Sequence, residues 1–234
     1  MLKKSQEVLV SDLGVVILTA PPTVDDPPGA MIKVDGRESV LRCMEMFSNR
    51  EGVFKTLVVI DPKQADEVKR KLSSHLMFMG IKLVTGGDTW WSQLAEAQKA
   101  LPPEIKHVLV HDGARPVVPY TDLDAILGMK GKKEVIALAC RSPGPIFKAD
   151  QLPGTGWTQD QSVVSLLTPV LFTREGLDRA VADGRFPSPI NLIEGSRLNV
   201  RVGTVDTGFA KAMLGLLPKP KVKAPTNPFE EAQW

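Results

Sequence analysis

Cysteine is scarce in this 234-residue sequence, which contains only Cys43 and Cys140. Neither belongs to a Cys-x-x-Cys pair or to a Cys/His cluster, so the sequence argues against a disulfide scaffold and against a structural zinc site. Isolated cysteines suit a reducing compartment, and we therefore expect a cytoplasmic protein.

The sequence also lacks a large excess of charge of either sign and lacks long hydrophobic runs. The formal net charge is +2 and no long run of one sign occurs, which gives no basic footprint for a nucleic-acid partner. Lys3 and Lys4 precede an apolar stretch, but Asp12 interrupts it. The uninterrupted apolar stretch that follows Asp12 favours a first core strand over a signal segment. It is also far shorter than the roughly 20 residues that span a bilayer. We expect no membrane partner.

Five short runs rich in β-branched and apolar residues are present between residues 14 and 141. Apolar and polar residues do not alternate in them, which predicts strands buried on both faces, as in a parallel sheet. Helix-length segments separate the runs, so the sequence predicts an α/β fold with helices on both faces of the sheet. The predicted strands are 14–20, 56–61, 81–87, 107–113 and 134–141, and the predicted helices are 39–50, 62–76, 88–101 and 120–129.

The strand–helix rhythm changes after Cys140. Residues 141–161 are rich in glycine and proline and predict a projecting arm. Residues 162–184 have helical spacing around a Thr-Pro break, and 197–217 predict one more strand and a closing helix. We expect a single domain over 1–217, followed by a proline-rich tail (218–234) whose composition predicts disorder.

The hexapeptide HDGARP, residues 111–116, is the strongest candidate site. In an open α/β sheet, ligands gather at the carboxyl ends of the strands. There, Asp112 could hold a divalent cation, and Gly113 lets the chain turn close to a ligand. The planar guanidinium group of Arg115 can donate two parallel hydrogen bonds to a phosphate. The alternative is that Asp112 caps a turn and Arg115 makes a structural ion pair. The loops expected at this edge are 19–30, 85–89, 111–116 and 203–206.

A second candidate is GGDTWW, residues 86–91, between a predicted strand and a predicted helix. Paired glycines allow main-chain N–H groups to face an anion or a base edge, although a left-handed turn explains them equally well. Trp90 and Trp91 either stack on a base or pack in the core. Of the histidines, His111 is the one beside a candidate site.

Several segments together resemble one family. HDGARP is similar to the HDAARP hallmark of the 2-C-methyl-D-erythritol 4-phosphate cytidylyltransferases, and the resemblance extends from about residue 14 to residue 215. The other matching segments are VVILTA (15–20), IKVDGRESVL (32–41), GGDTWWSQL (86–94), LLTPVLF (166–172) and EGSRLNVRV (194–202).

This resemblance implies a Rossmann-like nucleotidyltransferase fold and a homodimer joined by the arm at 141–161. It implies CMP transfer from CTP to a small polyol phosphate, 2-C-methyl-D-erythritol 4-phosphate, for isoprenoid synthesis, with Mg²⁺ bridging the phosphates. By position it assigns catalytic roles to Asp112 and Arg115, with Asp112 as the Mg²⁺ carboxylate. It assigns substrate contacts to Ala20, Gly86, Gly87, Asp88, His111, Gly113, Ala114, Thr168 and Arg201.

The first loop departs from the family pattern. Where the family has glycines, an arginine and a lysine around the triphosphate, residues 21–29 read PPTVDDPPG. Prolines have no N–H to donate, and Asp25 and Asp26 would repel a polyanion. Trp90 replaces a family arginine, and Gln93 replaces its base-contacting serine.

These departures predict that CMP transfer is impaired. Two alternatives stay open: a non-catalytic homologue that binds a ligand or a protein, and an enzyme with a different nucleotide donor. Lys33 or Arg37 could replace the missing cations from a shifted position.

Overall fold

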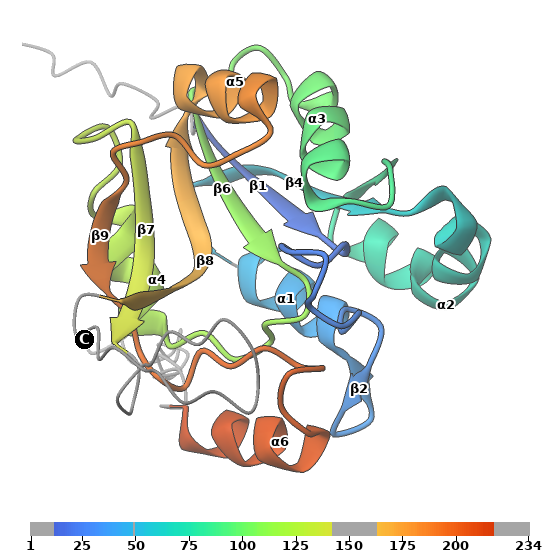
Figure 1. The fold of residues 1–234 in the computed structure, drawn as a ribbon. Helices are drawn as coiled ribbons and strands as arrows, with labels where there is room; N and C mark the ends of the chain where they lie inside the picture. The colour runs from blue at the N-terminus through green and yellow to red at the C-terminus, as the bar shows by residue number, and fades with distance from the viewer. Residues whose placement is uncertain (1–11, 49, 142–162, 218–234) are drawn as a thin grey trace, which may run out of the picture.

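A seven-stranded sheet forms the centre of the protein in the computed structural model, which describes residues 12–48, 50–141 and 163–217. Its strand order is β5-β4-β1-β6-β8-β7-β9 (Figure 1). Strands β5, β4, β1 and β6 are parallel, β8 runs antiparallel to β6 and β7, and β9 is parallel to β7. The strands are β1 (Leu13–Leu18), β4 (Val53–Ile60), β5 (Lys82–Thr85), β6 (His107–Asp112), β7 (Val135–Arg141), β8 (Val164–Thr173) and β9 (Asn191–Glu194).

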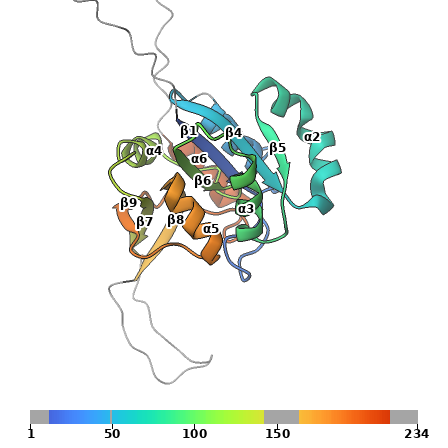
Figure 2. The ribbon, with the colours of Figure 1, turned by 90° about the horizontal axis from the view of Figure 1, so that it is seen from above.

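Helices cover both faces of this sheet (Figure 2). The central strands alternate between two cores: Val15 and Ile17 of β1 belong to one, and Val16 and Leu18 belong to the other. The first core contains α1 (Ser39–Ser48), α2 (Ala65–Phe78) and α4 (Tyr120–Leu127), and the second contains α3 (Trp90–Ala100) and α5 (Arg174–Asp183). The sheet, the predicted helices and the mostly parallel Rossmann-like arrangement are therefore confirmed.

A small third layer lies near the carboxyl ends of the central strands, where the arrowheads of β1 and β6 point (Figure 1). It consists of a two-stranded ribbon, β2 (Lys33–Val34) and β3 (Arg37–Glu38), and α6 (Thr207–Leu216). Val34, Val202 and Ala210 form its core. This layer brings the C-terminal part of the described chain against the edge where a ligand would bind.

The prediction for 162–184 was wrong in its first half. Residues 164–173 form strand β8, and the helix begins only at Arg174. The Thr-Pro break lies at a bulge, because β7 pairs with Val170 and next with Leu167, which leaves Thr168 and Pro169 outside the ladder. A bulge accepts a proline because it needs no N–H there.

The last predicted strand was also misplaced. Residues 197–217 contain only an isolated bridge between Val202 and Val205 before α6, and the remaining sheet strand is β9. The predicted arm at 141–161, after Arg141, and the predicted tail lie outside the described residues. Within the ranges that the structure describes, no helix is both long and apolar enough to cross a membrane.

Candidate active site

The hexapeptide at the end of β6 is closed inside the protein. The Asp112 side chain has no exposed surface. Its Oδ1 accepts a hydrogen bond from the Ala114 N–H (2.9 Å), and its Oδ2 accepts one from Arg201 Nε (2.8 Å). Arg115 Nε lies 3.8 Å from the same Oδ2. Burial raises the pKa of Asp112, and the Arg201 guanidinium opposes that shift. The negative charge of the carboxylate is therefore balanced by the positive charge of Arg201 within the chain.

His111 is a structural side chain in this network. Its Nε2 lies 2.9 Å from the Arg115 carbonyl oxygen, so Nε2 carries the proton. Its Nδ1 lies 3.1 Å from Thr168 Oγ1, which also accepts the Asp112 N–H at 3.1 Å and therefore donates its proton to His111. Burial lowers the pKa of His111 to about 3. The imidazole is thus neutral, buried and hydrogen-bonded at both ring nitrogens.

The two arginines connect the hexapeptide to distant segments. Arg115 Nη1 donates to the Asn199 carbonyl oxygen (2.8 Å), and Arg201 Nη1 donates to the Pro27 carbonyl oxygen (2.6 Å). Arg201 is 4% exposed, and its Nη2 is the one guanidinium nitrogen of this residue with no hydrogen-bond partner among the described residues. The structure brings Asp112, Arg115, Thr168 and Arg201 together as predicted, but in the arrangement of an internal ion-pair network.

The first loop is packed against the same network. A Cβ at Gly29 would lie 2.1 Å from the Val202 carbonyl oxygen and 2.8 Å from the Ala114 Cβ, so only glycine allows this approach. The proposed substitute cations pair elsewhere: Lys33 lies 3.7 Å from Glu38, and Arg37 lies 2.8 Å from Glu45. The carboxyl end of the loop is held through the Pro27 carbonyl oxygen and the close approach of Gly29, whereas residues 23–25 are exposed. Residues 21–29 contain no cationic side chain.

Gln93 of α3 supplies a contact that the sequence analysis missed. Its side chain is 1% exposed, and its Oε1 accepts hydrogen bonds from the N–H groups of Thr19 (2.9 Å) and Ala20 (3.0 Å) at the end of β1. Its Nε2 donates to the Gly87 carbonyl oxygen (3.1 Å) and to Thr19 Oγ1 (3.3 Å). Thr19 and Ala20 lie 74 and 73 positions from Gln93, and no local sequence pattern predicts contacts over that separation.

The paired glycines are explained by packing. A Cβ at Gly86 would lie 2.9 Å from the Gln93 Cα, and one at Gly87 would lie 2.2 Å from Ser92 Oγ. Trp90 is 2% exposed in the second core, which confirms packing rather than stacking on a base. Asp88, a predicted substrate contact, is exposed, and its side chain makes no hydrogen bond or ion pair with another described residue.

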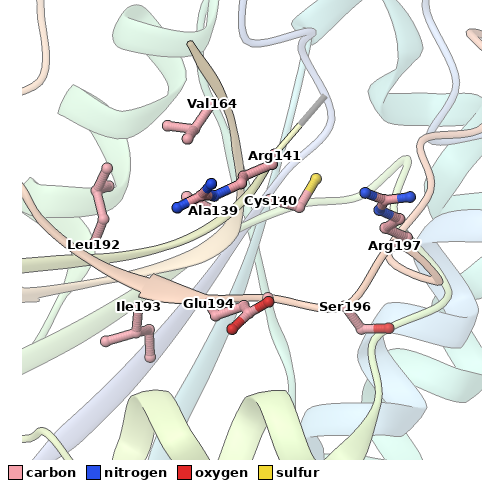
Figure 3. Close-up of a pocket in the computed structure, with 10 residues that line it drawn as sticks. Ala139, Cys140, Arg141, Val164, Leu192, Ile193, Glu194, Ser196 and Arg197 are labelled. Atoms are coloured by element: carbon pink, nitrogen blue, oxygen red, sulfur yellow. The ribbon is translucent and has the colours of Figure 1, made fainter. Parts of the chain in front are cut away.

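A different part of the sheet edge is open. A pocket of about 600 Å³ lies where β7 and β9 end (Figure 3). Arg141 and Arg197 line it from different segments, together with Glu194 and Ser196. Both arginines are exposed, and among the residues that the structure describes neither has an ion-pair partner. Exposed, unpaired guanidinium groups beside a concave surface suit a small anion.

The arrangement at Asp112 does not fit a resident Mg²⁺. Magnesium requires several oxygen ligands in near-octahedral geometry with access for water. The Asp112 carboxylate is inaccessible and pairs with Arg201, and the described residues contain no cluster of three or more side chains that could hold a metal. Asp112 would have to separate from Arg201 before it could hold Mg²⁺, and its role as a metal ligand stays a prediction.

The fold and the position of this network define a Rossmann-like nucleotidyltransferase. The model of one family, 2-C-methyl-D-erythritol 4-phosphate cytidylyltransferase, matches residues 23–189, which is more than half of the chain. The chain belongs to that family.

Sequence relatives carry the same description. The cytidylyltransferase of Streptomyces coelicolor is 33% identical over 102 residues, a match that covers 43% of this chain and 38% of that protein. The chain thus spans less than half the length of that relative. The enzyme of Bacillus velezensis is 24% identical over 200 residues, with 78% and 86% covered.

Solved structures share the fold. The 4-diphosphocytidyl-2C-methyl-D-erythritol synthase of Anaerococcus prevotii has a TM-score of 0.69 at 21% identity, with 87% of this chain and 98% of that chain covered. The cytidylyltransferase of Thermus thermophilus has a TM-score of 0.65 at 19% identity, with 86% and 98% covered.

Proposed function

We propose that the protein is a cytidylyltransferase whose transfer of CMP from CTP to 2-C-methyl-D-erythritol 4-phosphate is impaired. In that reaction a phosphate oxygen of the acceptor forms a bond to the α-phosphorus of CTP, and the bond to the bridging oxygen breaks to release pyrophosphate. Family membership supports the reaction class. The observation that carries the impairment is the closed state of Asp112, whose oxygens are both bonded within the chain.

Catalysis of phosphoryl transfer depends on preorganised charge around the transferred group. Removal of one such donor typically costs about 10²–10³ in rate, although several losses do not simply add. Here Pro21, Pro22, Pro27 and Pro28 replace N–H donors, and the first loop supplies two carboxylates and no cation. The expected loss is therefore at least about 10²-fold.

The experiment is a pyrophosphate-release assay with CTP, Mg²⁺ and 2-C-methyl-D-erythritol 4-phosphate, run beside the relative from Bacillus velezensis. The proposal expects a rate at least about 10²-fold below that of the relative. A rate within tenfold of the relative's rate would refute the impairment, provided that the activity co-purifies with the protein in two different purification procedures. Substitution of other nucleoside triphosphates for CTP in the same assay tests the alternative of a different donor.

A non-catalytic role is the second candidate, and the open pocket beside Arg141 and Arg197 favours it. Two unpaired guanidinium groups could bind a phosphate ester or a carboxylate without any transfer step. Thermal-shift screening of small phosphates and carboxylates distinguishes this role, because a ligand at 100 times its dissociation constant stabilises the protein by about 2.7 kcal/mol.

We also propose a cytoplasmic homodimer, on the strength of the family resemblance and the scarcity of cysteine. Light scattering after size-exclusion chromatography should give twice the mass of one chain, and the mass of a single chain would contradict the dimer.

A further inference from the structure

The Gln93 carboxamide is a polar group buried at the carboxyl end of β1. Burial of an amide is costly unless its donors and acceptors are bonded. Here the oxygen receives two N–H groups, from Thr19 and Ala20, and the nitrogen donates to the Gly87 carbonyl oxygen and to Thr19 Oγ1. Both ends of the carboxamide are therefore fully used.

The partners also determine which end is which. Two N–H donors can be satisfied only by an acceptor, and a carbonyl oxygen only by a donor, so the amide cannot be flipped. Thr19 Oγ1 donates to the Val59 carbonyl oxygen at 2.9 Å, which leaves its lone pair to accept from Gln93. The surrounding cradle thus has a defined polarity, with N–H groups on one side and a carbonyl oxygen on the other.

Such a cradle suits a particular class of ligand. It is complementary to a planar group that carries an acceptor and an N–H donor on one carbon atom. A carboxamide has this arrangement, and so do the N3–N4 edge of cytosine and the O4–N3 edge of uracil. The cradle lies at the end of a parallel strand, where ligands of α/β sheets bind.

We propose that Gln93 is an internal ligand that fills a subsite for a pyrimidine base, and that a nucleotide must displace it in order to bind. Gly86 permits this contact, because any side chain there would collide with Gln93 and push α3 away from β1. The inference rests on the proposed function for the identity of the ligand, and it assigns Gln93 an autoinhibitory role at that site.

The test is a calorimetric titration of CTP and of UTP, each with Mg²⁺, into the native protein and into Gln93→Ala and Gln93→Ser. Gln98→Ala is the matched control, since Gln98 lies on the same helix, on the surface, and contacts Asp178. The inference expects at least one nucleotide to bind the Gln93 variants about tenfold or more tightly than it binds the native protein and the control. Folded variants without this gain overturn the inference.

A second measurement needs no variant. The Thr19 N–H also donates to the Val59 carbonyl oxygen (3.2 Å), so only the Ala20 N–H reports on Gln93 Oε1. The Ala20 amide hydrogen should exchange with solvent at least about 10²-fold more slowly than an unprotected amide. Fast exchange at Ala20 would overturn the inference even if the variants failed to fold. The proposed function is tested by a different result: if the native protein released pyrophosphate at the relative's rate, the proposed impairment would be wrong, whatever the affinity of the Gln93 variants.

Discussion

Two stretches of the same sheet edge differ in whether their polar groups are available. At the ends of β1 and β6, Asp112 and Arg201 are both buried and bonded to each other. At the ends of β7 and β9, Arg141 and Arg197 are exposed and face an open pocket. The first stretch holds the residue types of an active site, and the second holds two guanidinium groups that have no ion-pair partner among the described residues. Residue type alone therefore does not make a site, because a ligand needs groups that the chain has not already satisfied.

The largest expected effect comes from breaking the closed network. Asp112→Asn removes the negative charge and leaves Arg201 and Arg115 buried without their counter-charge. Loss of one partner of a buried ion pair costs about 3–5 kcal/mol, and urea denaturation should show a decrease of that size in the free energy of unfolding.

Asp88→Asn is the matched control at the open surface. The Asp88 side chain is exposed and makes no hydrogen bond or ion pair with a described residue, so the change in the free energy of unfolding should stay within about 0.5 kcal/mol. Equal effects at the two positions would contradict the closed network.

The neutral, buried state of His111 predicts a pH dependence. Its pKa is about 3 in the folded protein against 6.5 ordinarily, so below pH 6.5 the unfolded chain binds the proton more readily. This contribution to stability is constant above pH 6.5 and is lost as the pH falls toward about 3. Its slope reaches about 1.4 kcal/mol per pH unit.

The measurement is the free energy of unfolding of the native protein and of His111→Asn from about pH 7.5 to about pH 4.5. The difference between the two proteins should shrink as the pH falls, because the variant lacks the titrating group. A constant difference over this range would mean that His111 is accessible and titrates normally.

A moderate effect is expected where the first loop meets the network. Gly29→Ala places a methyl group 2.1 Å from the Val202 carbonyl oxygen, so the loop must separate from the segment that carries Arg201. Overpacking of this kind costs about 1–3 kcal/mol, measurable by thermal or chemical denaturation.

Gly215→Ala in α6 is the opposite case. Apart from its chain neighbours and the backbone of its own helix, no described atom lies within 4 Å of the added methyl group, and alanine stabilises a helix relative to glycine. A gain of about 0.5–1 kcal/mol is expected. If Gly29→Ala were also stabilising, the loop would not be packed as described.

The smallest effect on stability is expected at the open pocket. Arg197→Ala removes an exposed side chain that has no ion-pair partner in the described part of the chain, and it should change the free energy of unfolding by less than about 0.5 kcal/mol. If the pocket binds a phosphate ester, the same variant should bind 2-C-methyl-D-erythritol 4-phosphate about tenfold more weakly, since a charge-assisted hydrogen bond contributes about 1.5–3 kcal/mol. Unchanged affinity in calorimetry, with Arg185→Ala as a surface control, would remove Arg197 from any ligand site.

Sequence patterns predicted the parallel part of the sheet well, because strands buried on both faces leave continuous apolar runs. They failed at β8, where Pro169 suggested a helix break and the bulge that accommodates it depends on the partner strand. They located the hexapeptide but not its burial, which is decided by Arg201, 89 positions away from Asp112. Gln93 was recognised only as a departure from the family, because two of its partners, Thr19 and Ala20, lie in the distant loop that follows β1.

The most direct measurement is an NMR titration of the native protein with CTP and Mg²⁺, followed through the main-chain amides of Thr19, Ala20 and Gly87. If the chain already satisfies the groups at the end of β1, these resonances should not move at CTP concentrations up to about 1 mM, the upper end of ordinary enzyme affinities. Saturable shifts of all three at micromolar CTP would show that the native protein binds the nucleotide at this position, and would contradict the account in which the chain itself already satisfies the polar groups at this edge of the sheet.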